Sequence, residues 1–159
     1  CDVTLQYGGE YFAAAVGEVN VVEKMKEVDA VIGGEGNGGV IYPELHYGRD
    51  ALVGVGLFLT YLCEQKCTCS ELKENLPIYY MSKNKIELEP TTDVDAILNK
   101  IADKYKDERV TTIDGVKIDF EDGWVHLRKS NTEPIIRIYS EGKTEEEAER
   151  FAKLIIDSI

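Results

Sequence analysis

The segment Arg128–Arg137 is the part of the sequence best suited to hold an anion. It has an arginine at each end, and the hydroxyl- and amide-bearing residues Ser130, Asn131 and Thr132 lie between them. Guanidinium groups present their donors in a planar fork that fits phosphate oxygens, and a polar turn can aim further donors into one concavity. These residues therefore indicate a site for a phosphate dianion. The alternative is a polar hairpin loop in which Asn131 and Thr132 hydrogen-bond their own backbone.

The charge of the whole chain gives these arginines more weight. The 159 residues carry a formal net charge of −12, with 43% hydrophobic and 30% charged residues, a composition typical of globular proteins. This excess of negative charge opposes binding to nucleic acid or to an anionic membrane surface. The apolar run Ala51–Leu62 is too short to span a bilayer. We therefore expect neither nucleic acid nor membrane as a partner, and any anionic ligand must be held by local positive groups.

The segment Gly33–Gly39 is the second unusual feature. Five of its seven residues are glycine, so its backbone can approach a ligand closely. Its spacing fits neither the dinucleotide-binding fingerprint nor the P-loop, which requires Lys followed by Ser or Thr. The side chains of Glu35 and Asn37 combine a carboxylate acceptor with an amide, a pair that suits neighbouring sugar hydroxyls. The alternative is a flexible connection with a solvated Glu35.

The cysteines and histidines form no recognisable metal-binding or catalytic motif. Cys63, Cys67 and Cys69 are spaced as C-x3-C-x-C, which matches no common zinc pattern, and no histidine lies close to them in the sequence. We interpret them as structural or incidental thiols, with a metal site or a disulfide as less favoured alternatives. We interpret His46 as an exposed loop residue and His126 as a structural or surface residue of a strand.

The two candidate loops together resemble the ligand loops of the α-D-phosphohexomutase superfamily. The family's sugar-binding loop follows the pattern Gly-Gly-Glu-x-Ser/Asn-Gly-His/Gly, and Gly33–Gly39 reads Gly-Gly-Glu-Gly-Asn-Gly-Gly. The segment Arg128–Pro134, which reads Arg-Lys-Ser-Asn-Thr-Glu-Pro, is similar to the family's phosphate-binding loop. The order and separation of the loops also fit. The resemblance covers nearly the whole chain, as the latter part of the family's third domain followed by its entire fourth domain.

The resemblance implies an enzyme that interconverts hexose 1-phosphates and 6-phosphates. In the family, a phosphoserine donates its phosphoryl group with the help of Mg2+, and a bisphosphorylated sugar is the intermediate. The resemblance implies that Glu35 and Asn37 bind sugar hydroxyls. The residues that it implies for the phosphate that is not transferred are Arg128, Ser130, Asn131, Thr132 and, as support or direct contact, Arg137. The loop sequence is most similar to that of phosphoglucosamine mutases. Phosphomannomutase/phosphoglucomutase activity and a non-catalytic sugar-phosphate-binding module are the alternatives.

Two departures from the family pattern bear on what these residues can do. Many members have a histidine where this chain has Gly39, so the general acid/base residue stays unassigned. The phosphoserine segment and the Asp-x-Asp-x-Asp metal loop should precede Cys1, so we expect a piece of a longer, cytoplasmic protein. We expect no catalytic residue, metal ligand or bound cofactor in the 159 residues. We predict that they are inactive alone, with the missing N-terminal domains of the same chain as their partner and a phosphosugar as their ligand.

Residues 1–77 are predicted to be the C-terminal part of an α/β domain. Strands alternate with helices there, which indicates a mixed sheet with partly parallel pairing. The expected strands are Tyr11–Val16, Asp29–Ile32 and Val40–Tyr42. The expected helices are Glu18–Val28, a helix capped by Asp50 that continues to about Glu64, and a short helix after a Thr68–Glu71 capping box.

Residues 78–90 are predicted to be a linker, and residues 91–159 a small α+β domain. An apolar stripe from Val94 to Tyr105 predicts one helix, and a capping box at Thr144 and Glu147 begins another. Asp114-Gly115 and Asp122-Gly123 indicate hairpin turns. The strand-like runs are Val110–Ile113, Val116–Phe120, Trp124–Arg128 and Ile135–Ser140. Together these elements predict an antiparallel sheet with two helices packed on one side.

Overall fold

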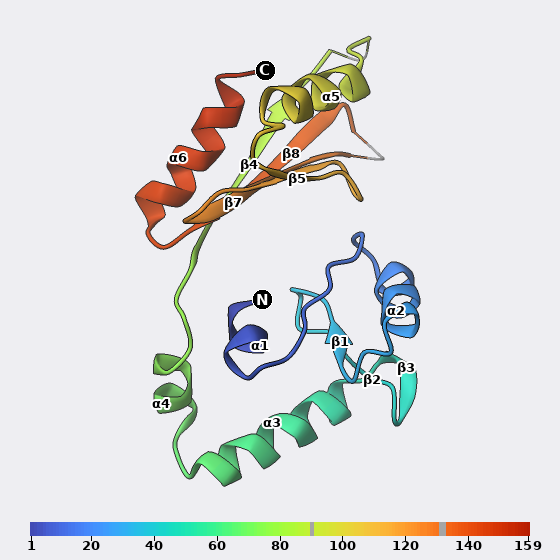
Figure 1. The fold of residues 1–159 in the computed structure, drawn as a ribbon, viewed down its shortest axis with the longest axis vertical. Helices are drawn as coiled ribbons and strands as arrows, with labels where there is room; N and C mark the ends of the chain where they lie inside the picture. The colour runs from blue at the N-terminus through green and yellow to red at the C-terminus, as the bar shows by residue number, and fades with distance from the viewer. Residues whose placement is uncertain (90, 131–132) are drawn as a thin grey trace. The chain divides into compact units, whose positions relative to one another are not determined.

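The chain folds into two compact units. The structure is a computed structural model that describes residues 1–89, 91–130 and 133–159. Its first unit comprises Cys1–Pro77 and its second Ile78–Ile159 (Figure 1). Each unit has its own sheet and contains one of the two candidate loops.

The first unit consists of four helices and a small sheet. The helices are α1 (Asp2–Gln6), α2 (Glu18–Glu27), α3 (Ala51–Gln65) and α4 (Cys69–Glu74), and the strands are β1 (Gly33–Gly34), β2 (Val40–Tyr42) and β3 (His46–Arg49). The strands lie in the order β1-β2-β3, and both neighbouring pairs are antiparallel. The predicted helices and caps at Asp50 and Thr68 are confirmed, including both bonds of the capping box between Thr68 and Glu71.

Three expectations for the first unit differ from the structure. Tyr11–Val16 and Asp29–Ile32 are not strands, because no other strand among the described residues lies beside them to take up their backbone hydrogen bonds. His46, interpreted as a loop residue, begins strand β3 (His46–Arg49). The pairing between the described strands is antiparallel, whereas partly parallel pairing was expected.

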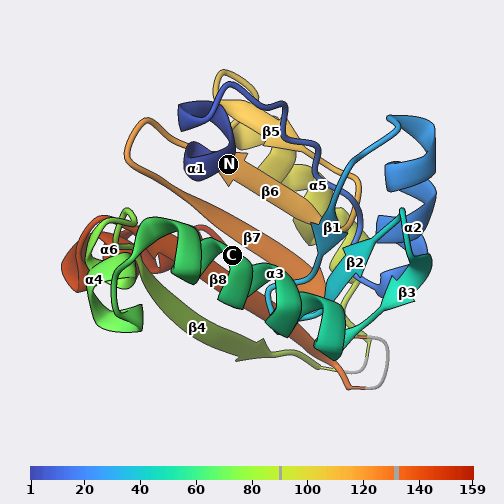
Figure 2. The same cartoon turned by 90° about the horizontal axis from the view of Figure 1, so that it is seen from below.

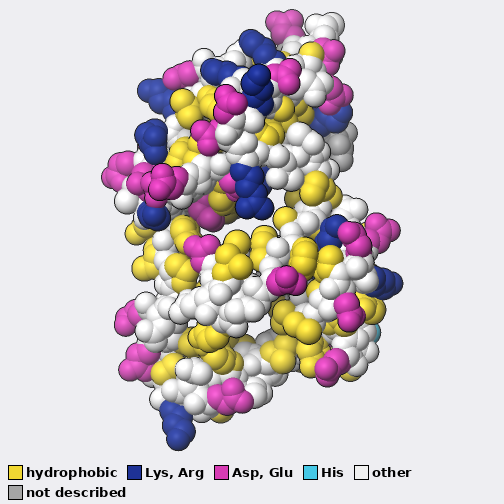
Figure 3. Space-filling view, viewed as in Figure 1, with side chains coloured by type: hydrophobic (Ala, Val, Ile, Leu, Met, Phe, Trp, Pro, Cys, Tyr) yellow, Lys and Arg dark blue, Asp and Glu magenta, His cyan; other side chains and the backbone are white. Residues whose placement is uncertain are grey.

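The first unit leaves much apolar surface in contact with solvent. Helix α3 has no buried residue, although most of its side chains are apolar, and Leu52 is 84% exposed. Tyr11, Phe12 and Val31 are also exposed, and Figure 3 shows hydrophobic side chains at the surface of this unit. The buried hydrophobic residues of this unit are Met25, Ile41 and Leu72. The unit thus has a small core for its size.

The second unit is a five-stranded antiparallel sheet with two helices. Its elements are β4 (Tyr80–Glu87), α5 (Val94–Lys104), β5 (Arg109–Thr111), β6 (Val116–Asp119), β7 (Gly123–Lys129), β8 (Ile135–Gly142) and α6 (Glu145–Ile156). The strand order is β4-β8-β7-β6-β5, which Figure 2 shows as five strands side by side. Every pair is antiparallel, as the sequence predicted.

The predicted linker at residues 78–90 is wrong for most of its length. Tyr80–Glu87 forms strand β4, which pairs with β8 over its whole length, from Tyr80 opposite Gly142 to Glu87 opposite Ile135. Most of its residues are polar, and only Ser82, Asn84 and Ile86 are partly buried, because β4 is an edge strand with one face toward the core. That pattern resembles an extended connection when it is seen without its partner strand.

The core of the second unit lies between the sheet and its two helices. Leu98 and Ile101 of α5 pack with Phe151 and Ile155 of α6 in one cluster. The strand residues in this cluster are Val116, Ile118, Val125, Leu127, Ile136 and Ile138. Figure 1 shows both helices on the same face of the sheet, as predicted. Among the described residues of this unit, no helix lies on the opposite face of the sheet.

None of the helices in the described part of the chain is long and apolar enough to cross a lipid bilayer.

Candidate functional site

The two arginines of the predicted phosphate loop lie directly opposite each other. Arg128 on β7 pairs in register with Arg137 on β8, and Arg137 pairs with Lys85 on β4. Paired residues of an antiparallel sheet project from the same face, and the neighbours Leu127 and Ile136 point into the core with no exposure. The three cations therefore form a row on the helix-free face of the sheet. Like charges placed opposite each other repel, and each of these three cations lies within 3.9 Å of a carboxylate oxygen.

The Asp114–Gly115 turn orients the Arg128 guanidinium. Nη1 of Arg128 lies 3.3 Å from Oδ2 of Asp114, and Nε2 of His126 donates to the Asp114 carbonyl. Gly115 has φ +73°, and a Cβ atom there would lie 2.1 Å from the carbonyl oxygen of Leu127. The turn can therefore press against β7 only because residue 115 is glycine. His126 is partly buried and supports this turn, in line with its interpretation as a structural residue.

The remaining described residues of the phosphate loop are tied to their surroundings. The N–H of Ser130 donates to the carbonyl of Ile135 at 3.0 Å, and Nη2 of Arg137 lies 3.9 Å from Oε2 of Glu133. Arg137 therefore contacts the loop. Asn131 and Thr132, which the sequence also assigned to phosphate binding, lie outside the described residues.

The predicted sugar-binding loop is the turn between β1 and β2. The N–H of Glu35 donates to the carbonyl of Gly39 at 3.0 Å, and the N–H of Gly38 donates to the carbonyl of Glu35 at 3.0 Å. Oδ1 of Asn37 accepts from the N–H of Gly39 at 3.0 Å. The amide oxygen of Asn37 is thus used within the loop, and its NH2 group is the part that can serve a ligand. Gly38 has φ +91° and open space around it.

Glu35 is held by an arginine that sequence reasoning did not identify. Its side chain is 16% exposed, and Oε2 lies 3.3 Å from Nη1 of Arg49 at the end of β3. Arg49 also contacts Glu18 at the start of α2, through Nε to Oε2 at 2.9 Å and through its backbone N–H to Oε1 at 3.1 Å. The backbone N–H and the guanidinium of Arg49 both hold the pKa of Glu18 below its usual range. Three separate elements thus meet at one ion-pair cluster.

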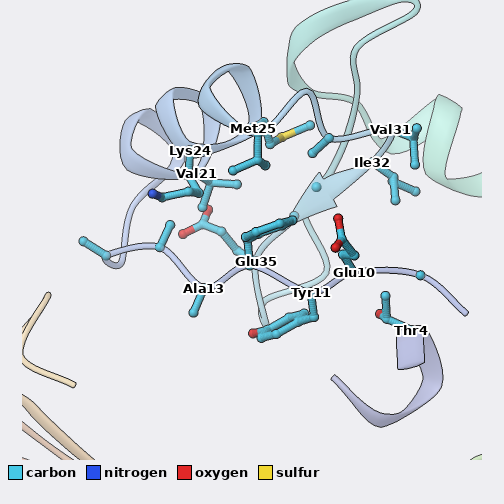
Figure 4. Close-up of a pocket in the computed structure, with 18 of the residues that line it drawn as sticks. Thr4, Glu10, Tyr11, Ala13, Val21, Lys24, Met25, Val31, Ile32 and Glu35 are labelled. Carbon is cyan, nitrogen blue, oxygen red and sulfur yellow. The ribbon is translucent and has the colours of Figure 1, made fainter. Parts of the chain in front are cut away.

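A cavity of about 580 Å³ lies next to Glu35. Figure 4 shows that its walls are mostly apolar, with Tyr11, Val21, Met25 and Ile32 among them, and Glu35 also lines it. An apolar lining does not suit a phosphate group, which needs charged or N–H donors. The cavity is therefore not the phosphate site.

The other residues considered from the sequence do not gather into a site. His46 lies in strand β3 rather than in a loop, and its Nε2 is 3.1 Å from Oδ2 of Asp50. The four cysteines are free thiols. Across residues 1–89, 91–130 and 133–159, no group of three or more His, Cys, Asp or Glu side chains could hold a metal ion.

Two family models match nearly the whole chain. The alpha/beta/alpha domain III of phosphoglucomutase/phosphomannomutase matches residues 2–80. The C-terminal domain of the same family matches residues 82–158. The two matches meet at residues 80–82, at the start of β4 and a few residues beyond Pro77, where the first unit ends.

Curated relatives agree with these matches. A phosphoglucomutase/phosphomannomutase of Thermococcus kodakarensis is 39% identical over 155 residues, covering 96% of this chain and 34% of the relative. A phosphoglucosamine/phosphogalactosamine mutase of Sulfurisphaera tokodaii is 42% identical over 132 residues, covering 82% of this chain and 29% of the relative. The chain thus spans about a third of the length of the curated relatives it matches.

A solved structure shows the same fold. The crystal structure of a phosphoglucomutase/phosphomannomutase family protein of Burkholderia thailandensis matches with a TM-score of 0.73 at 23% identity, covering 97% of this chain and 34% of that one. With domain models, relatives and fold in agreement, this chain belongs to the phosphoglucomutase/phosphomannomutase family of phosphohexomutases and carries its domain III region and its C-terminal domain.

Proposed function

We propose that the complete protein containing this chain is a phosphohexomutase that interconverts hexosamine 1-phosphate and 6-phosphate through a bisphosphorylated sugar. In this proposal, the second unit binds the phosphate that is not transferred and the first unit binds sugar hydroxyls. The nucleophilic phosphoserine and the Mg2+ ligands lie outside these 159 residues. Mg2+ would there neutralise charge on the phosphoryl group in transfer.

The row formed by Arg128, Arg137 and Lys85 carries the proposal. Two arginines lie opposite each other on adjacent strands, in a chain whose net charge is −12. Oδ2 of Asp114 lies 3.3 Å from Nη1 of Arg128, so this guanidinium is already oriented before a ligand binds. A phosphate anchored in this way fixes one end of the sugar. Fixing the substrate converts binding energy into correct positioning for in-line phosphoryl transfer at the other end.

The roles of the loop residues follow from their chemistry. Arg128 and Arg137 offer charged donors to the phosphate, and Ser130, Asn131 and Thr132 are proposed to add hydroxyl and amide donors. Glu35 accepts from sugar hydroxyls and the NH2 of Asn37 donates to them. Gly39 has no side chain that could transfer a proton, so we place acid–base chemistry outside this loop.

The names of the relatives support a hexosamine phosphate as the substrate. The relative from Sulfurisphaera tokodaii is named phosphoglucosamine/phosphogalactosamine mutase, and one from Methanopyrus kandleri is named probable phosphoglucosamine mutase. The relative from Thermococcus kodakarensis is named phosphoglucomutase/phosphomannomutase. Glucosamine phosphate is our first choice, with glucose and mannose phosphates as the alternatives. A phosphosugar substrate also fits the cytoplasmic location that we propose for the protein.

Steady-state kinetics on the complete gene product test this function. We expect turnover with glucosamine 6-phosphate at a higher kcat/KM than with glucose or mannose 6-phosphate. We expect Arg128→Met to lower kcat/KM by about 10- to 100-fold, the effect of losing charge-assisted hydrogen bonds to a phosphate. Arg109→Met is the matched control, because Arg109 is exposed on the edge strand β5. Arg109 pairs with Asp119 at the last residue of β6. The Asp114–Gly115 turn, which contacts Arg128, lies at the other end of that strand.

Two outcomes would count against the proposal. A wild-type protein without mutase turnover on any of the three sugars would leave at most a sugar-phosphate-binding module. An Arg128→Met variant with unchanged kcat/KM would remove the phosphate-holding role from this loop.

A further inference from the structure

We propose that Arg49 is a positioning residue that holds the carboxylate of Glu35 for the sugar, and that Gly39 is glycine because it makes room for Arg49. This inference rests on the proposed role of Glu35 in binding sugar hydroxyls. It assigns a task to a residue outside both ligand loops and gives a structural reason for the glycine at position 39.

Glu18 fixes Arg49 in place. The carboxylate of Glu18 accepts from both the side-chain Nε and the backbone N–H of Arg49, at 2.9 Å and 3.1 Å. This two-point contact ties the end of β3 to the first turn of α2. An arginine restrained by two bonds loses little further conformational freedom when it contacts a third group. Arg49 therefore acts as a fixed support for Glu35.

The contact with Arg49 leaves one oxygen of Glu35 available to a ligand. Nη1 of Arg49 lies 3.3 Å from Oε2 of Glu35, and no hydrogen bond joins Oε1 to another described residue. Glu35 is 16% exposed, so its carboxylate is restrained by its surroundings as well as by Arg49. A carboxylate with one oxygen held, and the other without a hydrogen bond to a described residue, can accept from a sugar hydroxyl with defined geometry.

Gly39 lies under the aliphatic part of Arg49. A Cβ atom at residue 39 would lie 2.5 Å from Cδ and 3.2 Å from Cγ of Arg49, and 3.2 Å from Oδ1 of Asn37. Contacts of 2.5 Å between carbon atoms are not tolerated, so any side chain here displaces Arg49. The backbone at Gly39 has no left-handed φ, so space rather than backbone conformation requires glycine. Gly39 and Arg49 thus form a matched pair.

A double-mutant cycle on the complete gene product tests the role of Arg49. We expect Arg49→Met to raise KM for the sugar phosphate about 10-fold, with a smaller change in kcat. We expect Glu35→Gln to raise KM at least as much. Because Arg49 acts through Glu35, the double variant should be no worse than Glu35→Gln alone, whereas independent effects would multiply. Arg49→Lys should be intermediate, because a lysine cannot bridge both carboxylates.

The second arm uses Gly39. We expect Gly39→Ala to reproduce part of the KM increase in the wild-type background and to have no further effect in Arg49→Met. Arg109→Met again serves as the control for the loss of an exposed arginine. Far-ultraviolet circular dichroism of each variant checks that it is folded. If Arg49→Met does not fold, Arg49→Lys and Gly39→Ala still test the inference.

The outcomes separate this inference from the proposed function. An active wild type with unchanged KM in Arg49→Met, or with fully multiplicative effects of Arg49→Met and Glu35→Gln, overturns the role of Arg49 and leaves the mutase proposal intact. A wild type that neither turns over nor binds any hexose phosphate overturns the proposed function, and the positioning role with it.

Discussion

The single carboxylate of Asp50 fixes where the longest helix of the chain begins. Its Oδ1 accepts from the N–H groups of Leu52 at 2.9 Å and Val53 at 3.0 Å, which satisfies two of the donors that the first turn of α3 leaves without partners. The hydrogen bond from Val53 is the main reason that the pKa of Asp50 is lowered, with His46 as the next cause. The cap therefore depends on the ionised form of Asp50.

Replacing Asp50 should make stability less dependent on pH. Asp50→Ala is expected to lower the Tm by a few degrees at neutral pH, because two backbone donors lose their acceptor. The folded-state pKa lies below the unfolded value of about 3.9. The stabilisation is thus fully present above that value and is lost as the pH falls through the folded pKa. Thermal unfolding should be measured from about pH 7 down to about pH 2. The difference in Tm between wild type and Asp50→Ala should become small only at acidic pH.

Glu64→Ala is the matched control for this measurement, since Glu64 is an exposed acid on the same helix. A difference in Tm between wild type and Asp50→Ala that is unchanged at the lowest pH would contradict the capping role of the ionised Asp50 carboxylate.

Capping residues could be predicted from the sequence, whereas the residues that orient the site could not. Thr68 and Thr144 act on N–H groups three residues away, so a short pattern contains the whole interaction. Glu18 and Arg49 are separated by 31 positions, and Asp114 and Arg128 by 14. Neither pair can be identified until the fold is known. Glu35 and Arg128 could therefore be predicted as site residues from the sequence, whereas their partners Arg49 and Asp114 could not.

Positive charge gathers on the helix-free face of the five-stranded sheet in the second unit. Lys85, Arg137 and Arg128 form one row across β4, β8 and β7. The next row along the strands adds Lys83 and Lys117, on either side of Tyr139 and His126. Several of these cations have acidic partners, as Lys85 has in Glu87 at 2.9 Å. The sheet thus places the phosphate loop at one end of a basic surface in an acidic chain.

Removing Lys85 tests whether this row contributes to binding as a unit. Lys85 is 62% exposed, and exposed charge pairs contribute little, so we expect Lys85→Met to weaken sugar-phosphate binding by only about 2- to 5-fold at low ionic strength. The difference should disappear at about 1 M salt, where the screening length is about 3 Å. Isothermal titration of the complete gene product at low and high salt measures both quantities.

Lys73→Met is the control for Lys85→Met, since Lys73 lies on α4 outside the sheet. A loss of binding that does not change with salt would show that Lys85 acts through packing and not through its charge.

The two sheets differ in how far the sequence predicted them. In the second unit, consecutive strands from β5 to β8 pair with each other, and turn signals such as Asp114-Gly115 and Asp122-Gly123 lie between some of them, so local patterns suffice. Strand β4 could not be predicted from local patterns, because its partner strand β8 lies far away in the sequence: Glu87 pairs with Ile135 and Tyr80 with Gly142. In the first unit, Tyr11–Val16 has the composition of a strand but no partner among the described residues. Composition predicts the tendency to be a strand, and pairing decides whether the strand forms.

For the molecule as a whole, the buried apolar residues are divided unevenly between the two units. In the described parts of the chain, Met25, Ile41 and Leu72 are the buried hydrophobic residues of the first unit. The second unit has a continuous cluster that includes Ile101, Ile118, Leu127, Ile138 and Phe151. Burial of apolar area is the main favourable contribution to folding. The second unit should therefore be the more stable of the two.

Hydrogen exchange on the 159-residue chain tests this difference. Backbone amides of β7 and β8 should exchange by global unfolding of the second unit and show the highest protection. Amides of α3 should exchange much faster, although they are in a regular helix, because none of its side chains is buried. Ile138→Ala, which is expected to cost about 2–5 kcal/mol, should lower protection throughout β7 and β8 and leave α3 unaffected. Equal protection of α3 and β8 in the wild type, or a loss of protection in α3 on Ile138→Ala, would mean that the two units unfold together.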